Sequence, residues 1–172
     1  MAEALKTKLE GRQAVVEALP DHPAVKALLD WKPEALTDAQ VDHGELTLTI
    51  AASDLVAAAE TLRINGYNYF EDMTAVDLFP SAPRFQLSYH FVSHAFRERI
   101  RLHAWAIEGG GDELPSIASL TPTWPSANYF EREVFDLFGI RFEGHPNLRR
   151  ILMPDEWEGH PLRKDYPVEG YR

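Results

Sequence analysis

The 172-residue sequence contains no cysteine, and this absence excludes several kinds of site. Disulfides, thiolate zinc sites, cysteine nucleophiles and cysteine-ligated iron–sulfur clusters all require a cysteine sulfur. If the protein takes part in electron transfer, we therefore expect the electron to travel on another chain. The lack of cysteine is also compatible with the reducing cytoplasm.

Long apolar runs and a surplus of basic residues are missing as well. No stretch approaches the ~20 apolar residues that cross a bilayer, and the first twenty residues contain no apolar block typical of a signal peptide. The net charge is −10, and residues 1–80 alone have a net charge of −8. Because non-specific nucleic-acid binding requires a basic face, we expect no nucleic-acid partner. We expect a soluble or peripheral protein without a membrane span.

Hydrophobic periodicity predicts an α+β fold. Apolar residues alternate with polar residues in the segments RFQLSYHFVS and RERIRLHAWAI, which we interpret as a β-hairpin. The predicted helices cover residues 3–19, 24–31, 54–66 and 127–138, and the predicted strands cover residues 38–42, 45–50, 67–79, 84–93 and 97–107. Ser53 and Ser126 are expected to cap the last two helices, and Gly139 is expected to end the final one. The result is one small domain with a mostly antiparallel sheet of about five strands packed by helices.

The chain is predicted to contain three parts. Residues 1–40 form an N-terminal helical segment, residues 41–140 form the α+β core domain, and residues 141–172 form an extended, proline-rich tail. Pro146, Pro154, Pro161 and Pro167 exclude a long helix from the tail. The tail has no net charge but is dense in both signs, which suits specific ion pairing. Its apolar residues exceed what a small domain can bury, so we expect a partner to order it.

The tail contains Gly-His-Pro twice, which raises the alternative of a metal site. His145 and His160 could bind zinc with help from Asp155, Glu156 or Asp165. The spacing differs from the i,i+4 pair of His-Glu-x-x-His, so hydrogen bonds from both imidazoles to backbone in turns are favoured.

Other kinds of catalytic site find little support in the sequence. The tail has no serine or threonine, and no Gly-x-Ser-x-Gly elbow occurs in the chain. Glu131 and Glu133 are two residues apart on the predicted helix and therefore point apart, which disfavours an acid–base pair. Arg132 and Asp136 are spaced for an i,i+4 ion pair instead. Docking to a partner remains the favoured role of this region.

The segment EREVFDLFGIRFEGHPNLRRILMPDEWEGHPLRKDYP, residues 131–167, resembles the signature of the 30 kDa (C-type) subunit family of NADH:quinone oxidoreductase, which is respiratory complex I. The resemblance extends to DMTAVD and SIASLTPTWPSANYFERE and covers roughly residues 45–170. Such a long and unusual run makes the resemblance highly specific. The first 40 residues contribute nothing to it.

The resemblance implies a non-redox subunit in the peripheral arm of a proton-translocating membrane complex, on the cytoplasmic side of the bacterial inner membrane. In that complex electrons pass from NADH through FMN and iron–sulfur clusters to a quinone, and these cofactors belong to other subunits. The implied partners are the D-type subunit, which resembles a hydrogenase large subunit, and the B-type and I-type subunits. Related membrane-bound hydrogenases and formate hydrogenlyase contain a similar protein, so these complexes remain an alternative.

No catalytic, cofactor-binding or metal-binding residue is expected on this chain. We predict instead a set of partner-docking residues on the last helix and the tail. They are Glu131, Arg132, Glu133, Asp136, His145, Arg149, Arg150, Trp157, His160, Arg163, Lys164, Asp165 and Tyr166.

Overall fold

The computed structural model describes residues 7–111 and 113–170. The chain divides into two compact units, Met1–Asp72 with Ser88–Ala104, and Met73–Leu87 with Trp105–Arg172. A two-stranded sheet pairs β7 (Ser116–Ala118) with β8 (Arg141–Glu143). A six-stranded sheet has the strand order β1 (Leu9–Glu10), β2 (Leu36–Asp42), β3 (Glu45–Ile50), β6 (Glu98–Trp105), β5 (Phe85–Ser93) and β4 (Tyr69–Asp77). The α+β class is confirmed, with a mixed sheet, because β3 runs parallel to β6 while β1, β2 and β3 pair antiparallel.

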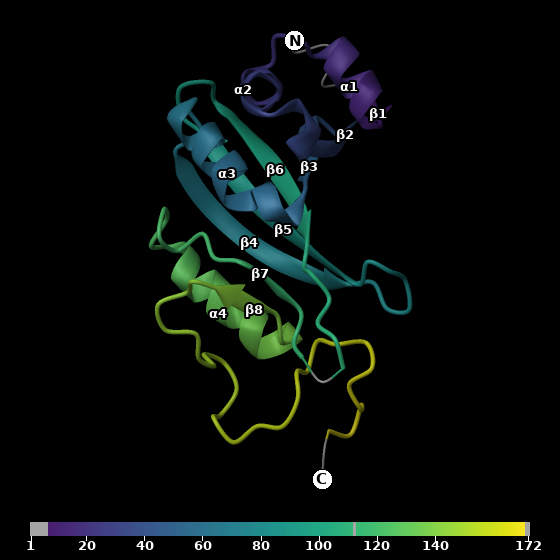
Figure 1. Cartoon of the computed structure of the whole chain (residues 1–172), viewed down its shortest axis with the longest axis vertical. Helices are drawn as coiled ribbons and strands as arrows, with labels where there is room; N and C mark the ends of the chain where they lie inside the picture. The colour runs from purple at the N-terminus through teal and green to yellow at the C-terminus, as the bar shows by residue number, and fades with distance from the viewer. Residues whose placement is uncertain (1–6, 112, 171–172) are drawn as a thin grey trace. The chain divides into compact units, whose positions relative to one another are not determined.

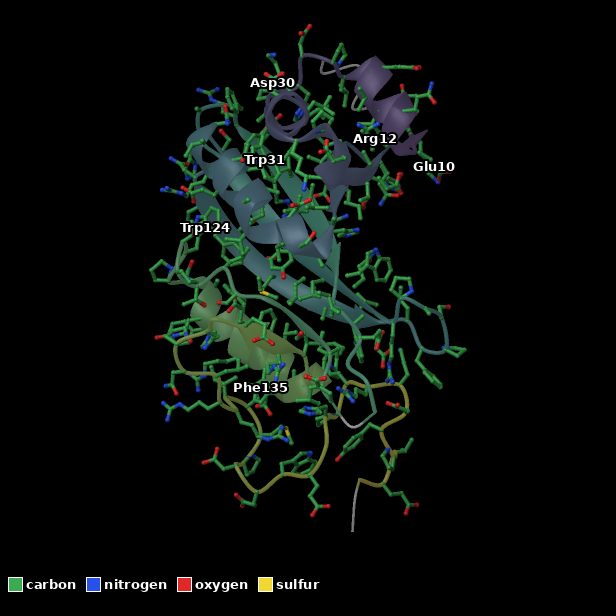
Figure 2. The ribbon with its side chains drawn as sticks, viewed as in Figure 1. Glu10, Arg12, Asp30, Trp31, Trp124 and Phe135 are labelled. Atoms are coloured by element: carbon green, nitrogen blue, oxygen red, sulfur yellow. The ribbon has the colours of Figure 1, made fainter. Side chains whose placement is uncertain are left out.

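In the first unit, the helix predicted over residues 3–19 is shorter in the structure than expected. Residues 3–6 lie outside the described part of the chain, and Leu9–Glu10 form the short strand β1, which pairs with Val41 and Gln40. Gly11 then has φ +92°, a left-handed conformation that separates β1 from helix α1 (Arg12–Ala18). Figure 2 shows Glu10 and Arg12 near this turn.

The predicted helix 24–31 is confirmed as α2 (Pro23–Trp31), which a 3-10 turn, Pro33–Ala35, follows. The next strands are β2 (Leu36–Asp42) and β3 (Glu45–Ile50). His43 and Gly44 connect β2 to β3, and both have the positive φ that a two-residue hairpin turn requires. The predicted boundary at residue 40 falls inside β2, so the described part of residues 1–40 is not wholly helical.

Helix α3 (Leu55–Ile64) lies against one face of the sheet (Figure 1). Ser53 does not cap it as predicted, because Ser53 is part of a 3-10 turn, Ala52–Asp54, that leads directly into the helix. Leu55 and Leu62 are fully buried on the inner side of α3.

The central strands follow the predicted alternation. They are β4 (Tyr69–Asp77), β5 (Phe85–Ser93) and β6 (Glu98–Trp105). The apolar face predicted for β5 is buried, and so is that of β6, as shown by Phe85, Leu87, Tyr89, Phe91, Ile100, Leu102 and Ala104.

The second unit contains β7 (Ser116–Ala118), α4 (Ala127–Phe138) and β8 (Arg141–Glu143). β7 and β8 are parallel, with Ile117 opposite Phe142. The first three residues of the predicted tail are therefore a strand of the folded unit, and Phe142 is buried. From Gly144 to Gly170 the tail has no helix or strand and curves around α4 (Figure 1).

No helix in the described ranges has both the length and the hydropathy needed to cross a bilayer.

Candidate functional site

Helix α4 is buried on more than one side, and two of its acidic residues lie inside the second unit. Its buried residues are Ala127, Glu131, Val134, Asp136 and Phe138. Glu131 and Asp136 are five positions apart, so at 100° per residue they point to different sides of the helix. Each carboxylate meets a different segment of the chain.

Glu131 fixes the turn that follows β7. Its carboxylate accepts hydrogen bonds from the Ser119 hydroxyl (2.5 Å), the Leu120 N–H (2.7 Å) and the Thr121 hydroxyl (3.0 Å). Burial raises the pKa of Glu131, and these hydrogen bonds oppose that effect. The side chain is completely buried, so its role is internal.

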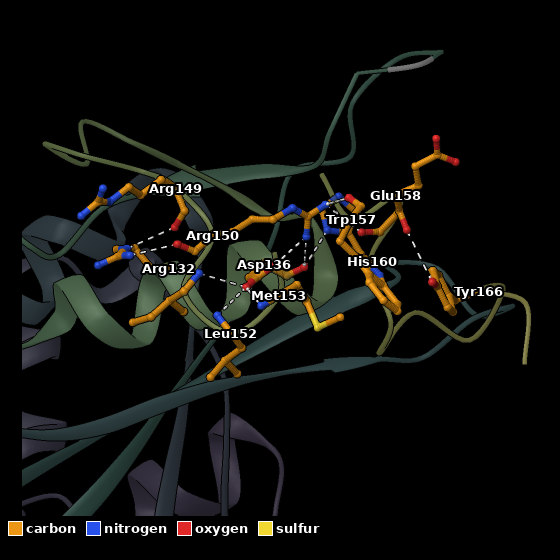
Figure 3. Close-up of polar contacts among 12 residues, drawn as sticks. Arg132, Asp136, Arg149, Arg150, Leu152, Met153, Trp157, Glu158, His160 and Tyr166 are labelled. Carbon is orange, nitrogen blue, oxygen red and sulfur yellow. Dashed lines mark hydrogen bonds and ion pairs between the residues drawn. The ribbon is translucent and has the colours of Figure 1, made fainter. Parts of the chain in front are cut away.

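Asp136 fixes the tail. One carboxylate oxygen accepts the successive backbone N–H groups of Ile151, Leu152 and Met153, at 3.0, 2.8 and 2.9 Å. The other accepts from Arg150 at 2.5 Å (Figure 3). Burial alone would raise the pKa of Asp136, but these hydrogen bonds outweigh it and hold the pKa below its usual value. A stretch of tail without secondary structure thereby obtains acceptors for its buried donors.

Two arginines extend this contact in opposite directions. Arg132 donates from Nε to the Arg149 carbonyl (3.1 Å) and from Nη2 to the Arg150 carbonyl (2.9 Å). Arg150 in turn donates to the carbonyls of Trp157 and Gly159, both at 2.9 Å. The predicted ion pair between Arg132 and Asp136 is thus replaced, since each residue binds the tail instead.

The tail also satisfies the carboxyl end of α4, where the last carbonyls of a helix lack partners within it. The Asp136 carbonyl contacts Nδ1 of His160 (2.9 Å), and the Leu137 carbonyl accepts from the Leu162 N–H (3.0 Å). Arg163 donates to the carbonyls of Phe138 (2.6 Å) and Gly139 (3.2 Å). A cation is favourable at this end because the helix dipole is negative there.

A second attachment point holds the tail further along. Arg84 binds the buried carboxylate of Asp77 through Nε (2.9 Å) and Nη2 (2.7 Å). The same guanidinium binds Asp165 through Nη1 (2.9 Å) and Nη2 (2.7 Å). Asp77 also accepts the Lys164 N–H at 2.8 Å. The tail is therefore attached to α4, to Asp77 at the end of β4 and to Arg84, which immediately precedes β5.

The second attachment predicts a loss of stability in acid. Burial would raise the pKa of Asp77, but hydrogen bonds from Arg84 and from the N–H groups of Lys164 and Phe79 lower it from 3.8 to about 2. Because the folded pKa lies below the unfolded one, this contribution is complete above about pH 4 and is lost as the pH falls toward 2. A shift of this size corresponds to about 2 kcal/mol.

We therefore expect urea unfolding of the Asp77→Asn variant to depend less on pH between pH 5 and 3 than unfolding of the wild type. Asp155→Asn, at an exposed position of the tail, should retain the wild-type dependence. If the free energy of unfolding changed equally with pH in Asp77→Asn and in the wild type, this carboxylate would not hold the tail through its charge.

The histidines of the two Gly-His-Pro triplets occupy turns, as the favoured interpretation predicted. His145 accepts the Asn147 N–H on Nδ1 (3.0 Å), and its Nε2 lies 3.4 Å from the Asn128 carbonyl. His160 contacts the Asp136 carbonyl. Burial lowers the pKa of both imidazoles. Among the described residues, no group of three or more metal-ligating side chains is placed to hold a metal ion.

Large apolar side chains of the tail remain exposed although its backbone is fixed. Leu152 is 60% exposed and Trp157 is 39% exposed, and Ile151, Leu162 and Val168 are exposed as well. The expectation that only a partner can order the tail is therefore corrected. Hydrogen bonds and ion pairs to its own unit fix the backbone, while the apolar surface is left available.

The predicted docking residues separate into two groups. Glu131 and Asp136 are completely buried and bind within the chain, so the structure gives them internal partners, and their docking role stays an untested prediction. Internal partners also engage Arg132, Arg150, His145, His160, Arg163 and Asp165, and Tyr166 donates to the Glu158 carbonyl. The exposed remainder, whose docking role stays a prediction, comprises Glu133, Arg149, Trp157 and Lys164.

Three residues of this site were not predicted from the sequence. Asp77 and Arg84 lie about 80 residues before the segment they bind, so no local pattern connects them to it. The sequence predicted only that Gly139 ends α4, and no role in packing the tail. A Cβ at Gly139 would lie 2.4 Å from Cδ2 of His160, so the glycine also makes room for the tail. For Asp77, the one available signal was an acidic residue at the end of an apolar strand.

Comparison with known proteins agrees with the family resemblance of residues 131–167. Residues 48–172 match the sequence family described as the respiratory-chain NADH dehydrogenase 30 Kd subunit. The C-type subunit of NADH-quinone oxidoreductase from Roseiflexus castenholzii is 45% identical over 152 residues, which cover 86% of this chain and 85% of the relative. The corresponding protein from Citrifermentans bemidjiense is 44% identical over 148 residues, which cover 86% and 89%.

Two solved structures are similar. A trypsin-resistant fragment (1–134) of Nqo5 has a TM-score of 0.61 and 27% identity, covering 73% of this chain and 99% of that one. A chain of the membrane-bound sulfane sulfur reductase, an archaeal respiratory membrane complex, has a TM-score of 0.69 and covers 84% of each chain. At 22% identity, the latter similarity concerns the fold alone.

Proposed function

Because the chain belongs to the family of respiratory-chain NADH dehydrogenase 30 kDa subunits, we propose that it is a non-redox peripheral-arm subunit of proton-translocating NADH:quinone oxidoreductase. Its role is to support assembly, with the tail docking on the D-type subunit. The observation that carries this proposal is a tail whose backbone is fixed by α4 while its large apolar side chains face outward.

The exposed apolar side chains of the tail support docking energetically. Full burial of a leucine or aromatic side chain contributes about 1.5–3 kcal/mol, and the tail presents several such side chains. Because the backbone is already held by Asp136 and Arg84, less conformational entropy is lost when a partner binds.

The proposed partners are the D-type subunit and, as near neighbours, the B-type and I-type subunits. FMN and the iron–sulfur clusters reside on other subunits of the complex, and the absence of cysteine in this chain supports that division. The chain itself contributes to an enzyme that transfers electrons from NADH to quinone, without catalytic residues of its own. Its proposed position is peripheral, on the cytoplasmic side of the bacterial inner membrane.

A related membrane-bound complex, such as a hydrogenase or formate hydrogenlyase, is the alternative setting. The similarity to the archaeal sulfane sulfur reductase complex is compatible with it. The relatives named for NADH-quinone oxidoreductase are about twice as identical to this chain, at 45% against 22%, and therefore favour the NADH-linked complex.

Copurification tests the proposal. A tagged chain, isolated from membranes in gentle detergent, should bring down a hydrogenase-large-subunit-like partner. Leu152→Glu should reduce the recovered partner at least tenfold, since it places a charge in an apolar contact. Ile64→Glu is the matched control, because Ile64 is 71% exposed on α3 and should leave recovery unchanged. Full recovery with Leu152→Glu would contradict docking through this part of the tail.

A further inference from the structure

Two stretches of the tail line a half-open pocket of about 530 Å³. Its lining residues come from two stretches of the tail and are Pro154, Glu156, Trp157, Glu158, Tyr166, Glu169 and Gly170. The lining residues include two aromatic residues and three glutamates, and no lysine, arginine or histidine is among them. Such a lining is complementary to a cation.

Contacts already described hold the walls of this pocket in place. Arg150 donates to the carbonyls of Trp157 and Gly159 on one side, and Tyr166 donates to the Glu158 carbonyl at 3.4 Å. Figure 3 shows Arg150 reaching from Asp136 toward Trp157, with Tyr166 beyond Glu158. The pocket is thus fixed by the same helix that fixes the tail, so little ordering is required when a ligand enters.

The arrangement of the carboxylates suits an organic cation better than a metal ion. In the described part of the chain, no three acidic or histidine side chains approach closely enough to share a metal. A guanidinium group is larger and planar, donates hydrogen bonds in several directions and stacks on aromatic faces. Trp157 is 39% exposed and offers such a face beside Glu156 and Glu158.

We propose that this pocket receives an arginine side chain of the partner polypeptide on which the tail docks. The indole of Trp157 stacks on the guanidinium, and Glu156 and Glu158 pair with it. This inference rests on the proposed docking function and adds the chemistry that the partner must present. It adds a cationic anchor to the apolar contacts that we propose for Leu152.

The pocket can be tested without the partner by titrating the full chain with N-acetyl-arginine amide and following the Trp157 indole N–H by NMR. We expect a saturable shift of this resonance. N-acetyl-citrulline amide, which has the same shape without the charge, should bind at least tenfold more weakly. Glu156→Gln combined with Glu158→Gln should weaken arginine binding at least tenfold. Asp155→Asn, between the wall residues but outside the lining, should change it less than twofold.

Equal binding of the arginine and citrulline compounds, or no saturable shift of Trp157, would overturn the inference. A second arm uses the assembled complex. Glu156→Lys with Glu158→Lys should reduce partner recovery at least tenfold, whereas Asp155→Lys should not. If Leu152→Glu loses the partner but the Glu156→Lys, Glu158→Lys double variant retains it, the docking proposal is kept and the arginine pocket is rejected.

Discussion

Replacing Asp136 by asparagine should accelerate hydrogen exchange at the amides of Ile151, Leu152 and Met153 at least 100-fold. The carboxylate is completely buried and is the shared acceptor of these three N–H groups and of Arg150. Removing one partner of a buried ion pair costs about 3–5 kcal/mol, because the remaining charge is left without compensation. The substitution lowers the free energy of local opening of the tail by that amount, and amide hydrogen exchange measures this opening free energy directly.

Two further variants separate the role of the charge from a general effect on α4. Glu133→Gln, on the exposed side of the same helix, should leave exchange in the tail unchanged. Arg150→Met combined with Asp136→Asn should recover part of the loss, because the double variant no longer buries an unpaired guanidinium. Unchanged exchange in Asp136→Asn itself would show that the tail is held by other contacts.

Gly139→Ala should destabilise the chain by about 3 kcal/mol, and Gly144→Ala by only about 1 kcal/mol. Both glycines have positive φ, +69° and +83°, so an alanine at either position is strained. The difference lies in their surroundings. A Cβ at Gly139 would lie within 2.7 Å of His160 and Arg163, whereas a Cβ at Gly144 meets nothing within 4 Å.

The larger cost at Gly139 has a structural cause. His160 and Arg163 would have to move, which breaks their hydrogen bonds to the carbonyls at the end of α4. Urea unfolding of the two variants measures the difference, and exchange of the Leu162 N–H shows whether the tail is displaced. Equal destabilisation by both substitutions would mean that only backbone strain matters and that the tail does not pack on Gly139.

The sheet was predictable because its pattern is local. In β5, the apolar positions Phe85, Leu87, Tyr89 and Phe91 alternate along one strand, and all four are buried. The strands β1, β7 and β8 were missed because each has only two or three residues, too few to show a period. Leu9–Glu10 also continue an apparent helical pattern that Gly11 interrupts.

The site was predictable in its location but not in its contacts. The unusual residues of 131–167 identified both the family and the region, yet Arg132 and Asp136 were assigned to each other by helical spacing. Asp136 instead binds residues 14–17 positions later, a distance over which no periodicity operates. The prolines of the tail provided a usable signal, since a segment without secondary structure must find other acceptors for its N–H groups.

Photocrosslinking in the assembled complex tests most directly whether the outward surface of the tail contacts a partner. Trp157 is replaced by p-benzoylphenylalanine, with Val56 on α3 as the control because both residues are 39% exposed. We expect an adduct between position 157 and the D-type subunit, and none from position 56. An intact complex in which position 157 yields no adduct with any partner protein would contradict the proposed docking.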